Sequence, residues 1–356
     1  IIEYAPYAIQ IISKDGTITS VNKAYEKMFN YSKDDIVNKN IFEFESVKKS
    51  GLDEKYRKVF NGAKFFQENV VFKSDISGLE FILNISIAAI KNEKGAVVAL
   101  INMINDDTER VLAERALQED LEMAQTIQRS LITSNYSHFS GVEVAIQFVP
   151  MMQVGGDLYD IYEIEDGKYR FFIGDATGHG VQAALSTMLI KSEYERLKLF
   201  EYPVNEALKQ FNNEYYSHYI QLNNYFTCFL LDVDVITSEI NYASGGHPEQ
   251  IVISQNEVQI INAKGSVIGA FPDRDFEQKN VSVNKGDKII LFSDGLAETL
   301  NVNDEFLGTD QLYNIINKYK EKPIKELISF IMSAIWEFQG NAPASDDVTL
   351  IGIEIE

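Results

Sequence analysis

Four acidic positions stand out because each lies at the end of an apolar run. They are Asp157 in VGGDLYD, Asp175 in FFIGDATGHG, Asp294 in IILFSDGLAE and Asp346 in ASDDVTL. A charged side chain beside a buried strand is rare unless it is paired or bound to a metal ion. Carboxylates gathered at one sheet edge repel one another by roughly 4 kcal/mol per pair at 4 Å and an effective dielectric of 20. Because a divalent cation removes this repulsion, the pattern predicts a metal centre.

The alternative is that each acid is only a turn residue, since Asp-Gly is a turn dipeptide in any protein. That explanation serves for one position but not for a set of four that all adjoin apolar runs, three of them beside glycine. Glycine allows backbone and ligand to approach closely. Oxygen ligands without clustered Cys or His favour Mg²⁺ or Mn²⁺ over zinc or copper. The single cysteine, Cys228, lies inside the apolar run NYFTCFLLDV, and we expect it to pack in the core.

The elements that would position these acids alternate between strands and long helices from residue 136 onward. Strand-like runs include GVEVAIQFVP, KYRFFIGD, KIILFSD and VTLIGIEIE. Helical periodicity marks GVQAALSTMLIKSEYERLKLF and PIKELISFIMSAIWEF. Antiparallel strands with helix pairs inserted between them favour two sheets packed face to face with helices outside.

The first 135 residues predict a different organisation. Residues 1–105 indicate a small α+β domain, with two strands around an Asp15-Gly16 turn, then short helices and three further strands. Residues 106–135 lack Gly and Pro and predict a helix. Within this helix, one set of residues follows the 4-3-4-3 spacing that is typical of a short coiled coil: Leu117, Leu121, Ala124, Gln128 and Leu131. An amphipathic helix that packs on its own domain is the alternative.

Composition narrows the classes of function. The chain has 53 Asp and Glu against 32 Lys and Arg, a formal net charge of −21, which argues against nucleic-acid binding. Residues 1–105 are nearly balanced and the remainder is strongly acidic, so a domain boundary is expected near residue 106. No apolar run is long enough for a membrane helix and no signal peptide is visible, so we expect a cytoplasmic protein without a membrane partner. The chain opens on Ile1 rather than Met, which leaves any upstream segment open.

Two resemblances to known families emerge from these motifs. Residues 1–105, with the stretch VNKAYEKMFNYSKDDIVNKN, resemble a PAS sensor domain, and Asp106-Asp107-Thr108 resembles the Asp-x-Thr junction that follows such domains. From about residue 120, VGGDLYD, GDATGHG, GGHP, FSDGLAE and SDDVT resemble, in the same order, the PPM metal-dependent protein phosphatases. The nearest branch is the bacterial SpoIIE-like one, whose members dephosphorylate regulators of sigma-factor partner switching in stress responses.

The resemblance implies an α+β chain in three parts: a PAS domain at 1–105, a helical coiled-coil linker at 106–135 and an α-β-β-α sandwich phosphatase at 136–356. It implies hydrolysis of phosphoserine or phosphothreonine on a regulatory protein, expected to be a STAS-type anti-sigma factor antagonist. The attacking group would be a hydroxide that bridges two Mn²⁺ or Mg²⁺ ions. The PAS domain would regulate this reaction through the linker helices, in a homodimer formed by the PAS domain and the linker.

The resemblance also implies a role for each matching residue. Asp175 would bridge the two ions, and the carbonyl of Ala176 would bind one of them. Asp294 and Asp346 would hold the other ion, and Asp157 would bind a metal directly or through water. The expected supporting residues, which hold ligands in place, are Gly156, Asp160, His179, His247 and Asp347. Unlike many larger family members, this chain has no basic residue between Arg129 and Lys168, so the metals would hold the substrate phosphate.

Other interpretations fit the sequence less well. A catalytically degenerate phosphatase fold that only binds a partner would lack a ligand acid, yet all are present. A PAS-linked diguanylate cyclase requires Phe after an acidic residue in its GG(D/E) motif, but Leu158 and Tyr159 follow Asp157. A sensor histidine kinase requires a linker histidine, and 106–135 contains none. Residues 1–105 contain neither Cys nor His, which excludes a flavin–cysteinyl adduct and removes the commonest haem ligand. The sequence does not identify what the PAS domain senses.

Overall fold

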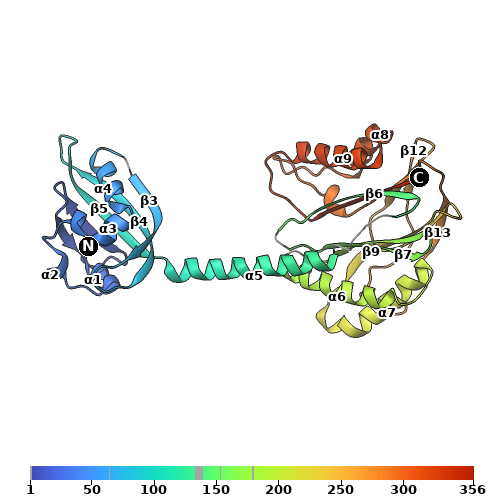
Figure 1. Cartoon of the computed structure of the whole chain (residues 1–356), viewed down its shortest axis with the longest axis horizontal. Coiled ribbons are helices and arrows are strands. Elements are labelled where there is room, and N and C mark those ends of the chain that lie inside the picture. Colours follow the sequence, from blue (N-terminus) through green and yellow to red (C-terminus); the bar gives the residue numbers. More distant parts are fainter. Residues whose placement is uncertain (1, 64, 133–138, 153, 179) are drawn as a thin grey trace. The chain divides into compact units, whose positions relative to one another are not determined.

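The computed structural model describes residues 2–63, 65–132, 139–152, 154–178 and 180–356. This part of the chain divides into two compact units, one ending at residue 119 and the other beginning at residue 120 (Figure 1). Helix α5 (Thr108–Ile132) therefore contributes residues to both units. Within the described ranges, no helix combines the length and apolarity that crossing a membrane requires.

The N-terminal unit is an antiparallel sheet with short helices packed on one face. Its buried core alternates along the strands, as at Ala8 and Ile12 of β1, because successive side chains of a strand point to opposite faces. The Asp15-Gly16 turn is confirmed, with Gly16 at a φ of 89°. The strands are β1 (Ala8–Ser13), β2 (Ile18–Val21), β3 (Phe65–Lys73), β4 (Glu80–Lys91) and β5 (Val97–Asp106), in the sheet order β2-β1-β5-β4-β3. The helices are α1 (Lys23–Phe29), α2 (Lys33–Ile36), α3 (Glu45–Lys49) and α4 (Leu52–Phe60), with 3₁₀ turns η1 (Ile2–Tyr4) and η2 (Ile41–Glu43).

The C-terminal unit contains two antiparallel sheets. One has the order β13-β10-β9-β8-β7 and the other the order β12-β11-β14-β15-β6. The first is built from β7 (Asp157–Glu165), β8 (Lys168–Ala176), β9 (Phe226–Asp234), β10 (Glu239–Gly245) and β13 (Lys279–Ser282). The second is built from β6 (Val142–Val149), β11 (Gln250–Ser254), β12 (Glu257–Ile261), β14 (Lys288–Phe292) and β15 (Val348–Ile355).

Two helix pairs complete the C-terminal unit. They are α6 (Val181–Leu197) with α7 (Val204–Tyr219), and α8 (Thr309–Tyr319) with α9 (Ile324–Gln339). The short turn η3 (Ile220–Leu222) follows α7, and the short turn η4 (Asp294–Leu296) follows β14. Proline precedes α7 and α9, at 203 and 323, where its fixed φ suits a helix start. Helix α9 ends at Gln339 and is followed by Gly340, whose φ is 59°.

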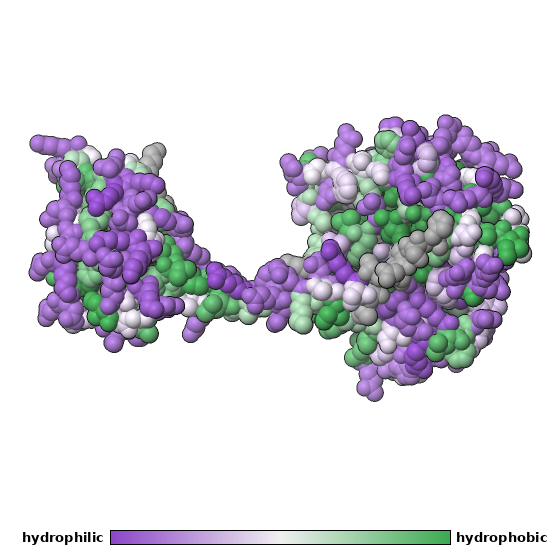
Figure 2. Space-filling view, in the orientation of Figure 1, coloured by the Kyte–Doolittle hydropathy of each residue, from purple (hydrophilic) through white to green (hydrophobic). Residues whose placement is uncertain are grey.

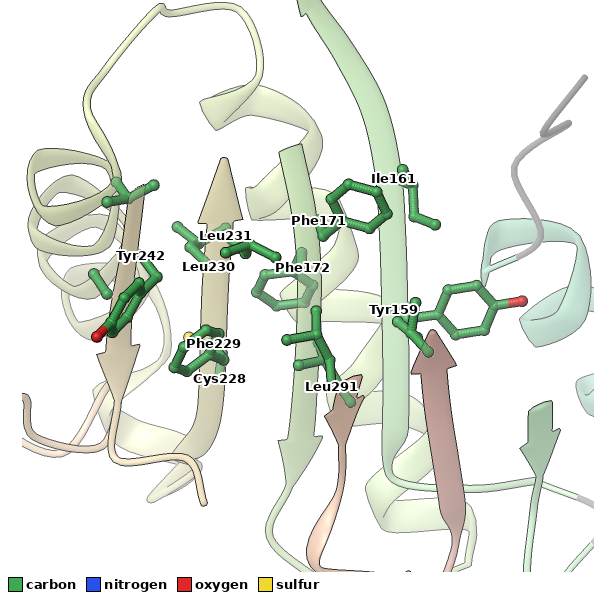
Figure 3. Packing of buried hydrophobic residues seen from close by; sticks show 14 of the residues in the cluster. Tyr159, Ile161, Phe171, Phe172, Cys228, Phe229, Leu230, Leu231, Tyr242 and Leu291 are labelled. Atoms are coloured by element: carbon green, nitrogen blue, oxygen red, sulfur yellow. The ribbon is translucent and has the colours of Figure 1, made fainter. Parts of the chain in front are cut away.

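Strand β14 shows how the layers are stacked. Its side chains are buried on both faces: Ile289 and Leu291 belong to the core between the sheets, whereas Ile290 and Phe292 pack with α8 and α9. Aromatic residues of β8, such as Phe172, pack with α6 and α7 on the other side. Figure 3 shows this packing, including Cys228, which is buried in the core as expected. The predicted α+β class and α-β-β-α sandwich are confirmed.

Candidate metal centre

Strands β7 and β8 place the first two acids opposite each other. Asp157, the first residue of β7, pairs in register with Asp175 near the end of β8. Residues directly opposite in an antiparallel pair project from the same face, so the two carboxylates share one side of the sheet. A backbone hydrogen bond lies next to the two acids: the Ala176 N–H donates to the Gly156 carbonyl at 3.0 Å.

The other sheet supplies the partners that fix Asp157. Both Ser293, which directly follows β14, and Thr349 in β15 donate hydroxyl hydrogen bonds of 2.6 Å to Oδ2 of Asp157. Only 1% of Asp157 is exposed. Burial and the charge of Asp175 raise the pKa of Asp157 well above its usual range, against the lowering effect of these two hydroxyls. A buried carboxylate in this position is stabilised by added positive charge.

Asp175 lies among further acids. Burial, followed by the charges of Asp294 and Asp346, raises the pKa of Asp175 to about 8. Burial, and then the charge of Glu298, also raises the pKa of Asp294 in η4. The structure thus places Asp175 within electrostatic reach of Asp157, Asp294 and Asp346, and the last two lie beside β14 and β15 of the other sheet. This convergence of like charges is typical of functional sites.

Glycines allow the segments to approach one another. A Cβ at Gly156 would lie 2.9 Å from the Ala176 carbonyl oxygen and 3.5 Å from Oδ1 of Asp175. A Cβ at Gly295 would overlap the carbonyl of Asp347 and lie 3.4 Å from Cβ of Asp346. Glycine is therefore required at both positions by close packing, as the flanking glycines of the motifs predicted.

Asp347 holds the loop that leads into β7. Its Oδ1 accepts the Met151 N–H at 2.6 Å, and its Oδ2 accepts the Gly156 N–H. A Cβ at Gly155 would lie 2.6 Å from this carboxylate. Asp346 accepts the N–H of Asp347 at 2.7 Å. The adjacent acids thus differ in role: Asp347 fixes the backbone before Asp157, while Asp346 contributes charge beside Asp175.

The structure does not bring every candidate to this cluster. Asp160 lies three residues beyond Asp157, on the opposite face of β7, and pairs with Lys191 at 3.1 Å and with Lys198. It therefore anchors α6 rather than the acids. His247 is buried, its Nδ1 lies 2.8 Å from the Thr227 hydroxyl, and burial lowers its pKa to about 3, so it is a neutral support for the GGHP turn. His179 lies outside the described residues.

Three contributors were not anticipated from the sequence. Ser293 and Thr349 stand inside the FSDGLAE and SDDVT motifs, where their hydroxyls could have been recognised as donors to a carboxylate. Gln128 of α5 was assigned to a coiled-coil seam, but it is buried against the loop before β7. Its Nε2 donates to the Gly155 carbonyl at 2.7 Å, and its Oε1 accepts the Gly155 N–H at 3.2 Å.

The donor set fits Mg²⁺ or Mn²⁺. It consists of carboxylates and the Ala176 carbonyl, the hard oxygen ligands that these ions prefer. The raised pKa values of Asp157, Asp175 and Asp294 show a site whose charge is uncompensated by the chain itself. Across the described ranges, no three Asp, Glu, His or Cys side chains form a ready coordination cluster. The fit therefore rests on donor chemistry and charge.

Comparison with known proteins decides the family. Residues 165–356 match the family of Stage II sporulation protein E (SpoIIE). The chain belongs to the SpoIIE family. Residues 6–109 match a PAS domain, which confirms the predicted combination of a PAS domain with a SpoIIE-type phosphatase domain.

Two curated relatives come from Bacillus subtilis. The chain is 27% identical over 240 residues to the phosphoserine phosphatase RsbU, covering 67% of this chain and 70% of RsbU. It is 23% identical over 243 residues to the phosphoserine phosphatase RsbP, covering 67% of this chain but only 58% of RsbP. The present chain thus spans under two thirds of the RsbP length.

Solved structures show the same fold. The SiaA-PP2C domain of Pseudomonas aeruginosa superposes with a TM-score of 0.62 at 22% identity, covering 68% of this chain and 99% of that domain. The RsbU and RsbW domains of Rv1364c from Mycobacterium tuberculosis give a TM-score of 0.52 at 21% identity, covering 61% and 60% of the two chains. The C-terminal unit of this SpoIIE-family member therefore has the fold of a PP2C domain.

Proposed function

We propose that this protein is a metal-dependent serine/threonine phosphatase that hydrolyses phosphoserine or phosphothreonine on a regulatory protein. The observation that carries the proposal is the convergence of Asp157, Asp175, Asp294 and Asp346 from two sheets, with raised pKa values for the first three. The relatives named phosphoserine phosphatases support the same chemistry. From the family resemblance, the substrate class we propose is a phosphorylated STAS-type anti-sigma factor antagonist.

Four carboxylates and one carbonyl would hold two Mn²⁺ or Mg²⁺ ions: Asp175 between both, Ala176 on one, Asp294 and Asp346 on the other, and Asp157 directly or through water. When bound, the ions would supply Lewis-acid activation of the phosphate and of an attacking water. Ser293 and Thr349 orient the Asp157 carboxylate and favour its charged form. Asp347 fixes the backbone of Met151 and Gly156, which sets where β7 begins.

Regulation through α5 is part of the proposal, and contacts at both ends of the helix support it. At its N-terminus, Thr108 accepts the Ile82 N–H of β4 at 2.8 Å and donates its own N–H to Asp106 at 3.0 Å. Near its C-terminus, Gln128 holds Gly155 and donates to the Thr187 hydroxyl of α6 at 2.8 Å. The same helix thus contacts the PAS sheet and the loop before Asp157.

A homodimer through α5 is also proposed. Leu117 is exposed, and Leu121 and Ala124 of the same heptad seam are partly exposed. A second copy of the helix would bury this seam. Gln128, although it shares the spacing, is occupied by its own phosphatase domain, so the paired region would end before it.

The experiment is a Mn²⁺ titration of p-nitrophenyl phosphate hydrolysis, run alongside thermal melting of the full chain. We expect saturable hydrolysis, and a melting temperature that rises with Mn²⁺, because an ion that binds only the native state stabilises it. A melting temperature indifferent to Mn²⁺, together with no hydrolysis, would instead support the binding-module alternative.

A further inference from the structure

A small apolar pocket lies next to the candidate metal centre. Its volume is about 40 Å³, and Asp346 forms part of its wall. The last turns of α9 supply Met332, Ile335 and Trp336, and Val149 at the end of β6 closes one side. This volume exceeds the space that one water molecule needs, and it suits the end of a small aliphatic side chain. We call this feature the α9 pocket.

Large apolar side chains are exposed at the α9 pocket and near the end of α9. Trp336 is 51% exposed and Val302 is 67% exposed. Val302 lies against the end of α9, since a Cβ at Gly340 would be 3.8 Å from its Cγ1. On the face drawn in Figure 2, hydrophilic residues cover much of the phosphatase domain, with apolar residues gathered between them. Trp is among the residue types enriched in binding hot spots.

The loop that joins α9 to β15 has a defined shape beside this pocket. Gln339 donates to the Ala342 carbonyl at 3.0 Å, and Ser345 donates to the Glu298 carbonyl at 2.9 Å. Asp346 follows directly on Ser345. Part of the pocket wall and one acid of the candidate metal centre, Asp346, thus belong to the same segment.

The α9 pocket offers a substrate little charge to contact. The chain after residue 105 has 40 acidic and 18 basic side chains. Of the residues that line the α9 pocket in the described part of the chain, Asp346 alone is charged. The phosphoserine group is itself anionic. The proposed cations would hold the phosphate, and the α9 pocket, whose lining other than Asp346 is uncharged, offers a contact beside it. Burial of an apolar side chain is the contact that the α9 pocket offers.

We propose that the α9 pocket receives an apolar side chain of the phosphoprotein substrate, close in sequence to the phosphorylated serine. This inference rests on the proposed phosphatase function. Because Asp346 belongs to both the pocket and the candidate metal centre, a short span of substrate joins them. At no more than ~3.5 Å per extended residue, the apolar residue lies within about four positions of the phosphoserine.

The test uses pairs of synthetic phosphoserine peptides that differ only by Leu or Ala at one position, scanned over four positions on each side. The Mn²⁺-loaded full chain is assayed for phosphate release. We expect the Leu peptide to exceed its Ala partner in kcat/KM by roughly 10-fold at one or two positions, mainly through KM. In Trp336→Ala this Leu/Ala ratio falls to near one, and in Trp336→Phe it is largely restored.

Leu199→Ala is the matched control, because Leu199 is 79% exposed and lies just beyond α6, away from the pocket residues. It should keep the wild-type Leu/Ala ratio. Equal rates for Leu and Ala peptides at every position, or a ratio unchanged in Trp336→Ala, would overturn the inference. Failure of the proposed function looks different: neither p-nitrophenyl phosphate nor any peptide would be hydrolysed with Mn²⁺.

Discussion

The side-chain amide of Gln128 pairs with both backbone polar groups of Gly155. Oε1 accepts the Gly155 N–H at 3.2 Å and Nε2 donates to its carbonyl at 2.7 Å. Gly155 stands two residues before Asp157, and the intervening Gly156 contacts Asp347 and Ala176. A shift of α5 at Gln128 would therefore move the backbone that carries Asp157.

Gln128→Ala should weaken metal binding. It leaves two buried backbone groups of Gly155 unpaired, at a cost of about 1–3 kcal/mol each where water cannot replace the amide. We expect the Mn²⁺ concentration for half-maximal p-nitrophenyl phosphate hydrolysis to rise several-fold. Gln125→Ala, one turn earlier on α5, is the control. Identical Mn²⁺ curves for Gln128→Ala and the wild type would remove the case for coupling through this residue.

Asp294→Asn should abolish most phosphatase activity. The substitution keeps the shape of the side chain but removes a charged oxygen ligand, and metal-ion catalysis is worth several kcal/mol. We expect kcat/KM to fall by about 100-fold or more at saturating Mn²⁺. Asp310→Asn, an exposed acid in the first turn of α8, is the matched control and should be unaffected. Normal rates in Asp294→Asn would refute the proposed ligand set.

The stability of the metal-free protein should fall as pH rises. Burial and neighbouring acids raise the pKa of Asp175 from 3.8 to about 8, so between these values the folded chain binds more protons than the unfolded chain. Stability decreases with pH under that condition. We expect the melting temperature in EDTA to drop from pH 5 to pH 8, less steeply in Asp175→Asn. Mn²⁺ should reverse this drop in melting temperature. Binding of Mn²⁺ should also release protons from the folded chain, and calorimetry in two buffers measures this release.

Thr349→Val should act through Asp157. Valine keeps the size of the side chain but removes one of the two hydroxyls that donate to Oδ2. At pH 8 we expect a loss of about 1–2 kcal/mol in unfolding free energy, and a higher Mn²⁺ requirement, because a hydrogen bond to a charged group disappears. Thr126→Val, whose hydroxyl donates to a carbonyl on exposed α5, controls for the substitution. Equal effects of the two variants would contradict the role given to Thr349.

Leu117→Glu should lower the oligomeric state if α5 pairs with a second copy. A buried seam position cannot accept an unpaired carboxylate without a large desolvation cost. We expect light scattering to show a dimer for the wild type and a monomer for Leu117→Glu. Ala116→Glu places the same charge on the neighbouring face and should remain dimeric. A monomeric wild-type chain would refute the dimer.

Much of the fold was predictable because local patterns agreed with the tertiary structure. Apolar runs such as KIILF became strands buried on both faces, and prolines 203 and 323 mark helix starts. The linker was harder to predict. Heptad spacing grouped Gln128 with Leu117, but spacing along a helix describes only which residues share a face. It does not describe which surface covers that face.

The sequence by itself determined the acids of the candidate site, their order and the family, because those depend on residue types at fixed local spacing. Tertiary structure decided which acids meet. Asp157 and Asp160 lie on opposite faces of β7, and both faces are buried, so hydropathy could not show which one joins the other sheet. Packing of the two sheets brought Ser293 and Thr349 to Asp157. On the other face of β7, packing of α6 brought Asp160 to Lys191 and to Lys198, which directly follows α6. Long-range contacts of this kind, across 136 and 192 residues, have no local signature.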